Sequence, residues 1–151
     1  MRALILESLY EWCKRPCRNF MKPNRAWSIT ANALLNYPED SLGFHLGCFL
    51  LKHSFEIQPK LESHDVFHLL TGIGVSVSEE ISMQYYLMGN GKRSLYLLFV
   101  ILIGTLLYPD QWKFFRNAYQ KGKSALIFHQ LDFSKLLYQP LSKIKSTFLI
   151  P

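Results

Sequence analysis

The stretch HDVFHLLTGIGVSVSEE, residues 64–80, predicts two helices joined by a short turn. Its first part has apolar side chains at four of the positions 66–70, a spacing that predicts one buried helical face. The Thr71-Gly72 pair should end this helix, because glycine is the usual residue past a helix end. Ser76 and Glu79 fit a capping box, in which each side chain satisfies a free amide at a helix start. The stretch therefore predicts a helix pair in an all-α protein.

The polar residues of the first helix share one narrow face. Each helical residue advances by about 100°, so His64 and His68 lie about 40° apart and Asp65 lies about 60° from His68. Two imidazoles at this spacing can both reach one divalent ion. The following loop is short enough to fold the next helix back beside the first, so Glu79 or Glu80 could supply a further ligand. Because the capping box occupies Glu79, we expect Glu80 to face the histidines.

Three other interpretations of this stretch remain open. The first helix could simply be solvent-facing, with a polar face that has no specific role. The spacing also resembles the H-E-x-x-H zinc-protease motif, in which the glutamate acts as base on the metal-bound water. Asp65 replaces that glutamate, and its shorter side chain would reach this water poorly. An HD-type phosphohydrolase would use the adjacent His-Asp pair with His53 and with Asp110 or Asp132. That interpretation leaves His68 and Glu80 unexplained.

Length and composition indicate one domain with its own core. A chain of 151 residues suits a single domain, and 49% hydrophobic with 15% aromatic residues is too apolar for a disordered chain. The 17 basic and 11 acidic side chains give a formal charge of +6, which favours anionic partners. No nucleic-acid-binding signature is visible, so we expect no nucleic-acid partner. A solvated basic face and a membrane-surface contact remain open for the densest basic group, which comprises Lys14, Arg15, Arg18, Lys22 and Arg25.

The longest apolar run is LYLLFVILIGTLLY, residues 95–108. A membrane-spanning helix needs about 20 apolar residues, so this run is short for a span. A buried helix and a helix that contacts lipid remain the alternatives. The sequence contains no visible secretion or transit signal, and three cysteines leave no even set of disulfide pairs. We therefore expect a cytoplasmic protein.

Turn signals divide the rest of the chain into further helices. We expect helical segments from about 3 to 13, 27 to 35, 38 to 52, 94 to 107, 111 to 118 and 133 to 146. The third of these should begin with an acidic first turn, Pro38-Glu39-Asp40. The sequence QKGKSA, residues 120–125, predicts a basic turn, and a short extended piece should follow over 125–129.

The metal motif and its flanks resemble those of the coenzyme Q biosynthesis protein Coq-four family. The pattern H-D-x-x-H, eleven residues, then E is satisfied by His64, Asp65, His68 and Glu80. Upstream, YPEDSLGFHLGCFL is similar to the family's Pro-x-x-(Ser/Thr)-Leu-Gly helix start. Downstream, FRNAYQKGKSA and LSKIKSTFLI resemble its Gly-Lys turn and its closing helix. The resemblance covers roughly residues 24–150, within one domain spanning 1–151.

The resemblance implies a fold and a site. The fold is an all-helical, compact domain with a central metal-motif helix pair. The site is a divalent metal held by His64, Asp65, His68 and Glu80, which would also be the catalytic residues. Zinc is the usual suggestion for the family, and iron, manganese or cobalt also suit these donors.

The resemblance also implies a role in ubiquinone biosynthesis. The family is described as removing the C1 carboxylate of a prenylated hydroxybenzoate ring with hydroxylation, and also as organising the biosynthetic enzymes at a membrane. We interpret the chain as a metal-dependent decarboxylase, a lyase, of bacterial type. Arg116 and Lys123 could assist the metal, and a non-catalytic lipid-binding scaffold with a structural metal is the alternative. Expected partners are a polyprenyl quinone precursor or other isoprenoid lipid, the acidic inner face of the cytoplasmic membrane, other quinone-biosynthesis enzymes and a second copy of the chain.

Overall fold

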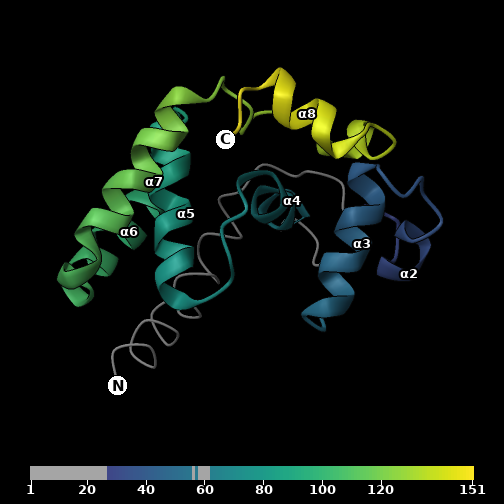
Figure 1. The fold of residues 1–151 in the computed structure, drawn as a ribbon. Coiled ribbons are helices and arrows are strands. Elements are labelled where there is room, and N and C mark those ends of the chain that lie inside the picture. The colour runs from purple at the N-terminus through teal and green to yellow at the C-terminus, as the bar shows by residue number, and fades with distance from the viewer. Residues whose placement is uncertain (1–26, 56, 58–61) are drawn as a thin grey trace. The chain divides into compact units, whose positions relative to one another are not determined.

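Every regular element in the described part of the chain is a helix, which confirms the all-α prediction (Figure 1). The computed structural model describes residues 27–55, 57 and 62–151. The predicted helix at 3–13 and the basic group at 14–25 lie outside these residues. The helices are α2 Ala31–Leu34, α3 Leu42–Lys52, α4 Glu62–Thr71, α5 Val77–Gly89, α6 Leu95–Leu107, α7 Trp112–Ser124 and α8 Leu141–Thr147, with the 3-10 turns η1 Pro109–Gln111 and η2 Phe133–Leu136.

The described residues divide into two compact units. One contains the residues up to Gly72 together with Gln130–Pro151, and it includes α2, α3, α4 and α8. The other contains Ile73–His129 and includes α5, α6 and α7. The expectation of one domain over 1–151 stays a prediction.

In the first unit, α3 begins later than the sequence predicts. The expected acidic first turn, Pro38-Glu39-Asp40, is a turn outside the helix, in which the Ser41 amide donates to the Pro38 carbonyl at 2.9 Å. Ser41 is the N-cap, and its Oγ accepts from the Phe44 amide at 3.1 Å. Ser41 also forms an antiparallel bridge with Pro140, so tertiary pairing holds this residue extended.

Two other helices are shorter than predicted. The expected helix at 27–35 is a single turn, Ala31–Leu34, because Thr30 is extended and caps it through the Ala33 amide at 3.2 Å. The expected helix at 133–146 is interrupted, and α8 begins only at Leu141. Pro140 lies at the interruption, where it has no amide to continue a helix.

Helix α4 ends where the sequence predicts. Gly72 directly follows it with φ +67°, a conformation that glycine adopts without a side-chain clash. Val66 and Leu70 of α4 are fully buried, and the Phe67 ring packs edge-on against Phe133 with centroids 5.7 Å apart. The apolar face predicted for this helix is therefore a core face.

In the second unit, α5 and α7 pack with their backbones very close together. A Cβ at Gly122 would lie 2.0 Å from the Tyr86 carbonyl oxygen, and one at Gly89 would lie 2.2 Å from the Tyr119 carbonyl oxygen. The predicted basic turn at 120–125 is therefore wrong, because α7 continues through Gly122 to Ser124. This glycine permits helix packing and does not break the helix.

Asn90 connects the end of α5 to the segment after α7. Its side chain is buried, donates to the Leu126 carbonyl at 2.9 Å and accepts from the Phe128 amide at 3.1 Å. These bonds satisfy the backbone of the extended piece, which has no strand partner among the described residues. The pKa of the neighbouring His129 is lowered, mainly by burial, and the hydrogen bond to Asn90 offsets part of this effect.

Helix α6 is buried on one side only. Leu97 and Gly104 are buried, seven residues are partly exposed and four leucines are exposed, so the predicted buried helix over residues 95–108 is half-buried. Among the described residues no single helix is long and apolar enough to cross a membrane; by length and composition alone, α6 and Pro109–Ser124, bent by 104°, could do so together. Four leucines, which we call the leucine stripe, are 48% to 87% exposed: Leu95, Leu98, Leu102 and Leu106.

Candidate metal centre

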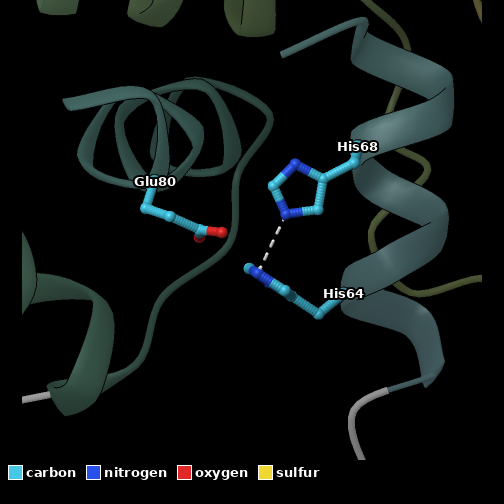
Figure 2. Close-up of side chains that lie close together, drawn as sticks. All are labelled: His64, His68 and Glu80. Carbon is cyan, nitrogen blue, oxygen red and sulfur yellow. Dashed lines mark hydrogen bonds between the residues drawn. The ribbon is translucent and has the colours of Figure 1, made fainter. Parts of the chain in front are cut away.

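The two motif histidines lie side by side on α4, as their spacing predicts. The Nε2 atoms of His64 and His68 are 3.2 Å apart, and the rings are nearly perpendicular at 87° (Figure 2). One ring can donate to the other, with tautomers that decide the direction. The same separation also suits metal binding, since two nitrogens 2.0–2.1 Å from one tetrahedral zinc ion lie about 3.3 Å apart.

The environment of His68 restricts its imidazole. His68 is 4% exposed, and its ring stacks on Phe49 of α3, with centroids 5.7 Å apart and planes 18° apart. Phe49 in turn contacts His53 and Phe55, with centroids at 4.7 and 6.2 Å. An imidazole packed in this way has few rotamers available, which reduces the entropy that a ligand loses when it binds a metal.

The start of α5 separates the two glutamates as the sequence predicts. Ser76 and Glu79 form the capping box, in which the Ser76 amide and hydroxyl donate to Glu79 Oε2 at 3.0 and 2.5 Å. A Cβ on Gly74 would lie 2.5 Å from this carboxylate, so the glycine leaves space for the capping glutamate. Glu80, one residue on, takes no part in the box.

His64, His68 and Glu80 form a group that could hold a metal ion. Each offers one ligand atom, and these atoms lie within 4.8 Å of one another (Figure 2). Two imidazoles and a carboxylate are donors that zinc accepts, and iron, manganese and cobalt accept them as well. In catalytic zinc sites three protein ligands typically leave a fourth position for water or substrate. Asp65 is outside this group, and its predicted role as a fourth ligand stays a prediction.

The additional residues nominated for an HD-type site, His53, Asp110 and Asp132, are also outside the group. Asp132 accepts from Ser134 Oγ at 2.5 Å and pairs with Lys135 at 3.1 Å. The bond from Ser134 is the main cause that lowers the pKa of Asp132. Asp110 is exposed and accepts from Gln111 at 3.2 Å. Arg116 and Lys123 are exposed on α7, and their assistance to a metal stays a prediction.

Sequence reasoning missed Phe49 and Gly74. Gly74 has a local signal, because it precedes the capping glutamate by five residues in a loop that must make room for its carboxylate. Phe49 has none, since its stacking on His68 depends on how α3 packs against α4.

The comparisons with known proteins find a shared fold. No protein-family model matches the chain, and no curated protein matches it. The chain is similar to a crystal structure of a Nostoc punctiforme protein that is provisionally assigned to ubiquinone biosynthesis. The TM-score is 0.67 at 16% identity, over 98% of this chain and 80% of the other. At this identity the likeness shows the all-helical fold alone.

Proposed function

We propose that the chain is a metal-dependent protein of ubiquinone or related prenyl-quinone biosynthesis and a relative of the Coq-four family. The observation that carries the proposal is the pair of Nε2 atoms 3.2 Å apart on α4, with Glu80 as the third donor. The likeness to the Nostoc punctiforme protein supports the proposal, because that protein is provisionally assigned to the same process.

The proposed substrate is a hydroxybenzoate ring with a polyprenyl tail. A divalent cation held by His64, His68 and Glu80 would supply positive charge for the ring carboxylate or phenolate. In the proposed reaction the bond from C1 to the carboxylate breaks, carbon dioxide leaves and a hydroxyl takes its place on C1. This exchange removes two electrons from the ring, so it requires a two-electron oxidant. With dioxygen and water as co-substrates it balances, because the carboxylated ring, dioxygen and water give the phenol, carbon dioxide and hydrogen peroxide.

The packing around His68 supports a catalytic role for this site. Phe49 restricts the imidazole from one side, so the ligand is oriented before a metal binds. We propose that this chain uses the position left by its three donors for substrate. A scaffold that only binds lipid would need no such position, because structural sites are closed by protein ligands.

Metal analysis of the purified protein tests the site. The wild-type protein should contain close to one equivalent of a divalent metal, and the double variant His64→Ala, His68→Ala should contain almost none. His45→Ala is a matched control, because His45 lies on α3 outside the three-residue group. Equal metal content in the wild type and the double variant would refute the site.

The two neighbouring glutamates give a sharper test. Glu79→Gln should retain the metal, since glutamine can also complete a capping box. Glu80→Gln should weaken metal binding by roughly 10- to 100-fold or more, because a carboxylate ligand becomes a neutral amide. Isothermal titration with zinc measures both, and the reverse order of affinities would overturn the assignment of Glu80.

Activity is tested separately from metal binding. In a bacterial strain that lacks the gene, we expect a carboxylated ring with a polyprenyl tail to accumulate. Mass spectrometry of extracted lipids detects this compound. Complementation with the wild type should remove this compound, and complementation with Glu80→Gln should not. If Glu80→Gln complements fully although it has lost the metal, the function does not require the metal and the metal-dependent proposal is refuted.

A further inference from the structure

The leucine stripe of α6 lies on one side of the helix. Leu95, Leu98, Leu102 and Leu106 fall within an arc of about 80° at 100° per residue. Leu97 and Gly104, the buried residues of the helix, lie on the opposite side. Contiguous apolar surface of this kind is uncommon on proteins that have no partner.

The opposite side of α6 is attached to α5 within the same unit. A Cβ on Gly104 would lie 2.7 Å from Ile81, so the two helices approach closely. Thr105 Oγ1 lies 2.6 Å from the Tyr85 hydroxyl. A helix of 13 residues is also only about 20 Å long, against about 30 Å for the hydrocarbon core of a bilayer. The helix therefore suits a surface contact and not a span.

Exposed aromatic side chains follow α6 directly. Trp112 and Phe114 are 49% and 40% exposed at the start of α7, beyond the 104° bend. Trp112 packs edge-on against Tyr85 with centroids 6.3 Å apart, which holds its indole in place. Tryptophan beside leucine is the composition of helices that lie in a membrane interface.

The charge of this region favours an anionic surface. The described residues of this unit, 73–129, contain six basic side chains and three acidic ones, Glu79, Glu80 and Asp110. Arg93 precedes the leucine stripe, and Lys113 and Arg116 follow it, all exposed. Each basic residue near an anionic bilayer contributes about 1 kcal/mol to binding. Two copies of the chain that met through this face would bring like charges together, which disfavours a second copy as the occupant.

We propose that the leucine stripe, with Trp112 and Phe114, docks this unit on an acidic lipid bilayer as a peripheral contact. The proposal deepens the proposed function and rests on it for its biological purpose, because the polyprenyl tail of the proposed substrate resides in the bilayer. The docking itself requires neither the metal nor the reaction. Leucine side chains enter the acyl boundary, while the basic side chains remain at the headgroups.

Vesicle flotation tests the leucine stripe. The full-length protein should float with vesicles of phosphatidylcholine and phosphatidylglycerol. Leu102→Ser should weaken this binding about tenfold, which corresponds to roughly half or more of the free energy of burying one leucine side chain. The double variant Leu102→Ser, Leu106→Ser should weaken it about 100-fold by the same reasoning. Leu51→Ser on α3 is the control, since Leu51 is 46% exposed in the other unit and should have no effect.

The basic residues give an independent arm. Lys113→Gln with Arg116→Gln should weaken binding to the mixed vesicles about 30-fold at low salt, at about 1 kcal/mol for each charge. The control pair Lys52→Gln with Lys143→Gln removes the same charge from the other unit and should change binding little. Wild-type binding should also fall in high salt and in pure phosphatidylcholine.

Three results would overturn the proposal. Wild-type protein that fails to float with the mixed vesicles refutes docking directly. If Leu102→Ser instead converts a dimer to a monomer in light scattering and leaves flotation unchanged, a second copy covers the stripe. If it lowers the melting temperature and leaves flotation unchanged, the stripe packs within its own chain. The variant His64→Ala, His68→Ala should float normally, so failure of the metal site and failure of docking are distinguishable.

Discussion

Helices α5 and α6 are neighbours in the chain and equal in length at 13 residues, yet the more apolar helix, α6, is the less buried of the two. Every residue from Ile81 to Leu87 in α5 is buried, including Ser82 and Gln84. Helix α6 is almost wholly apolar, and only Leu97 and Gly104 are buried. Apolar composition therefore does not predict which of the two helices forms the core.

The number of neighbouring helices explains the difference. Helix α5 contacts both α6 and α7, so its side chains are enclosed on two sides, and glycines in α5 and α7 bring two backbones together. Helix α6 contacts α5 along one face, and the opposite face has no covering helix among the described residues. A polar residue on an enclosed helix becomes buried, and a leucine on a helix with one neighbour remains exposed.

The largest expected effect is the difference in stability loss between a leucine truncated on α5 and one truncated on α6. Leu87→Ala should lower the free energy of unfolding by about 3 kcal/mol, because a fully buried side chain leaves a cavity. Leu102→Ala should change it by less than about 0.5 kcal/mol, since its side chain is 60% exposed. Urea unfolding followed by circular dichroism measures both. Equal losses for the two variants would mean that the leucine stripe is part of a core.

A smaller effect tests why α5 is enclosed. Gly122→Ala should lower the free energy of unfolding by about 2 kcal/mol, because the new methyl group would overlap the Tyr86 carbonyl oxygen. The same change in an exposed helix interior would raise stability by about 1 kcal/mol. Gln120→Ala, on the exposed side of the same helix, is the control and should be nearly neutral. A stabilised Gly122→Ala would show that the two helices can separate at no cost.

The sequence predicts local features of this fold well. The capping box of Ser76 and Glu79, the helix end before Gly72 and the adjacent histidines of α4 are all confirmed. Each depends on residues three to five positions apart, whose interaction follows from helix geometry. The end of α4 and the start of α5 are therefore each predictable from the amino-acid sequence alone.

Features that depend on distant contacts were not predictable. The QKGKSA segment has the composition of a turn, but α7 continues through it because Gly122 packs against α5. Ser41 begins α3 because its backbone pairs with Pro140, about 100 residues later in the chain. In the candidate site, Phe49 orients His68 through the packing of α3 on α4. Phe49 and Gly122 carry no local signal for these contacts, whereas Ser41 is a local N-cap signal that the Pro38-Glu39-Asp40 turn obscured.

The smallest expected effect concerns two tyrosines on α5 that differ in one hydrogen bond. Thr105 donates its hydroxyl proton to the Ile101 carbonyl at 2.6 Å, so Tyr85 is the donor in its own bond to Thr105. Tyr85→Phe should therefore lower the free energy of unfolding by about 1 kcal/mol.

The Tyr86 hydroxyl is buried without a hydrogen-bond partner in the described part of the chain, and burial raises its pKa to about 12. Tyr86→Phe should raise the free energy of unfolding by up to about 1 kcal/mol, since an unpaired hydroxyl costs desolvation free energy and phenylalanine retains the ring contact with Phe128. Urea unfolding of both variants at neutral pH measures the difference in sign between them. A loss of stability in Tyr86→Phe as large as that in Tyr85→Phe would mean that an internal water bonds this hydroxyl, and that the enclosure of α5 includes solvent.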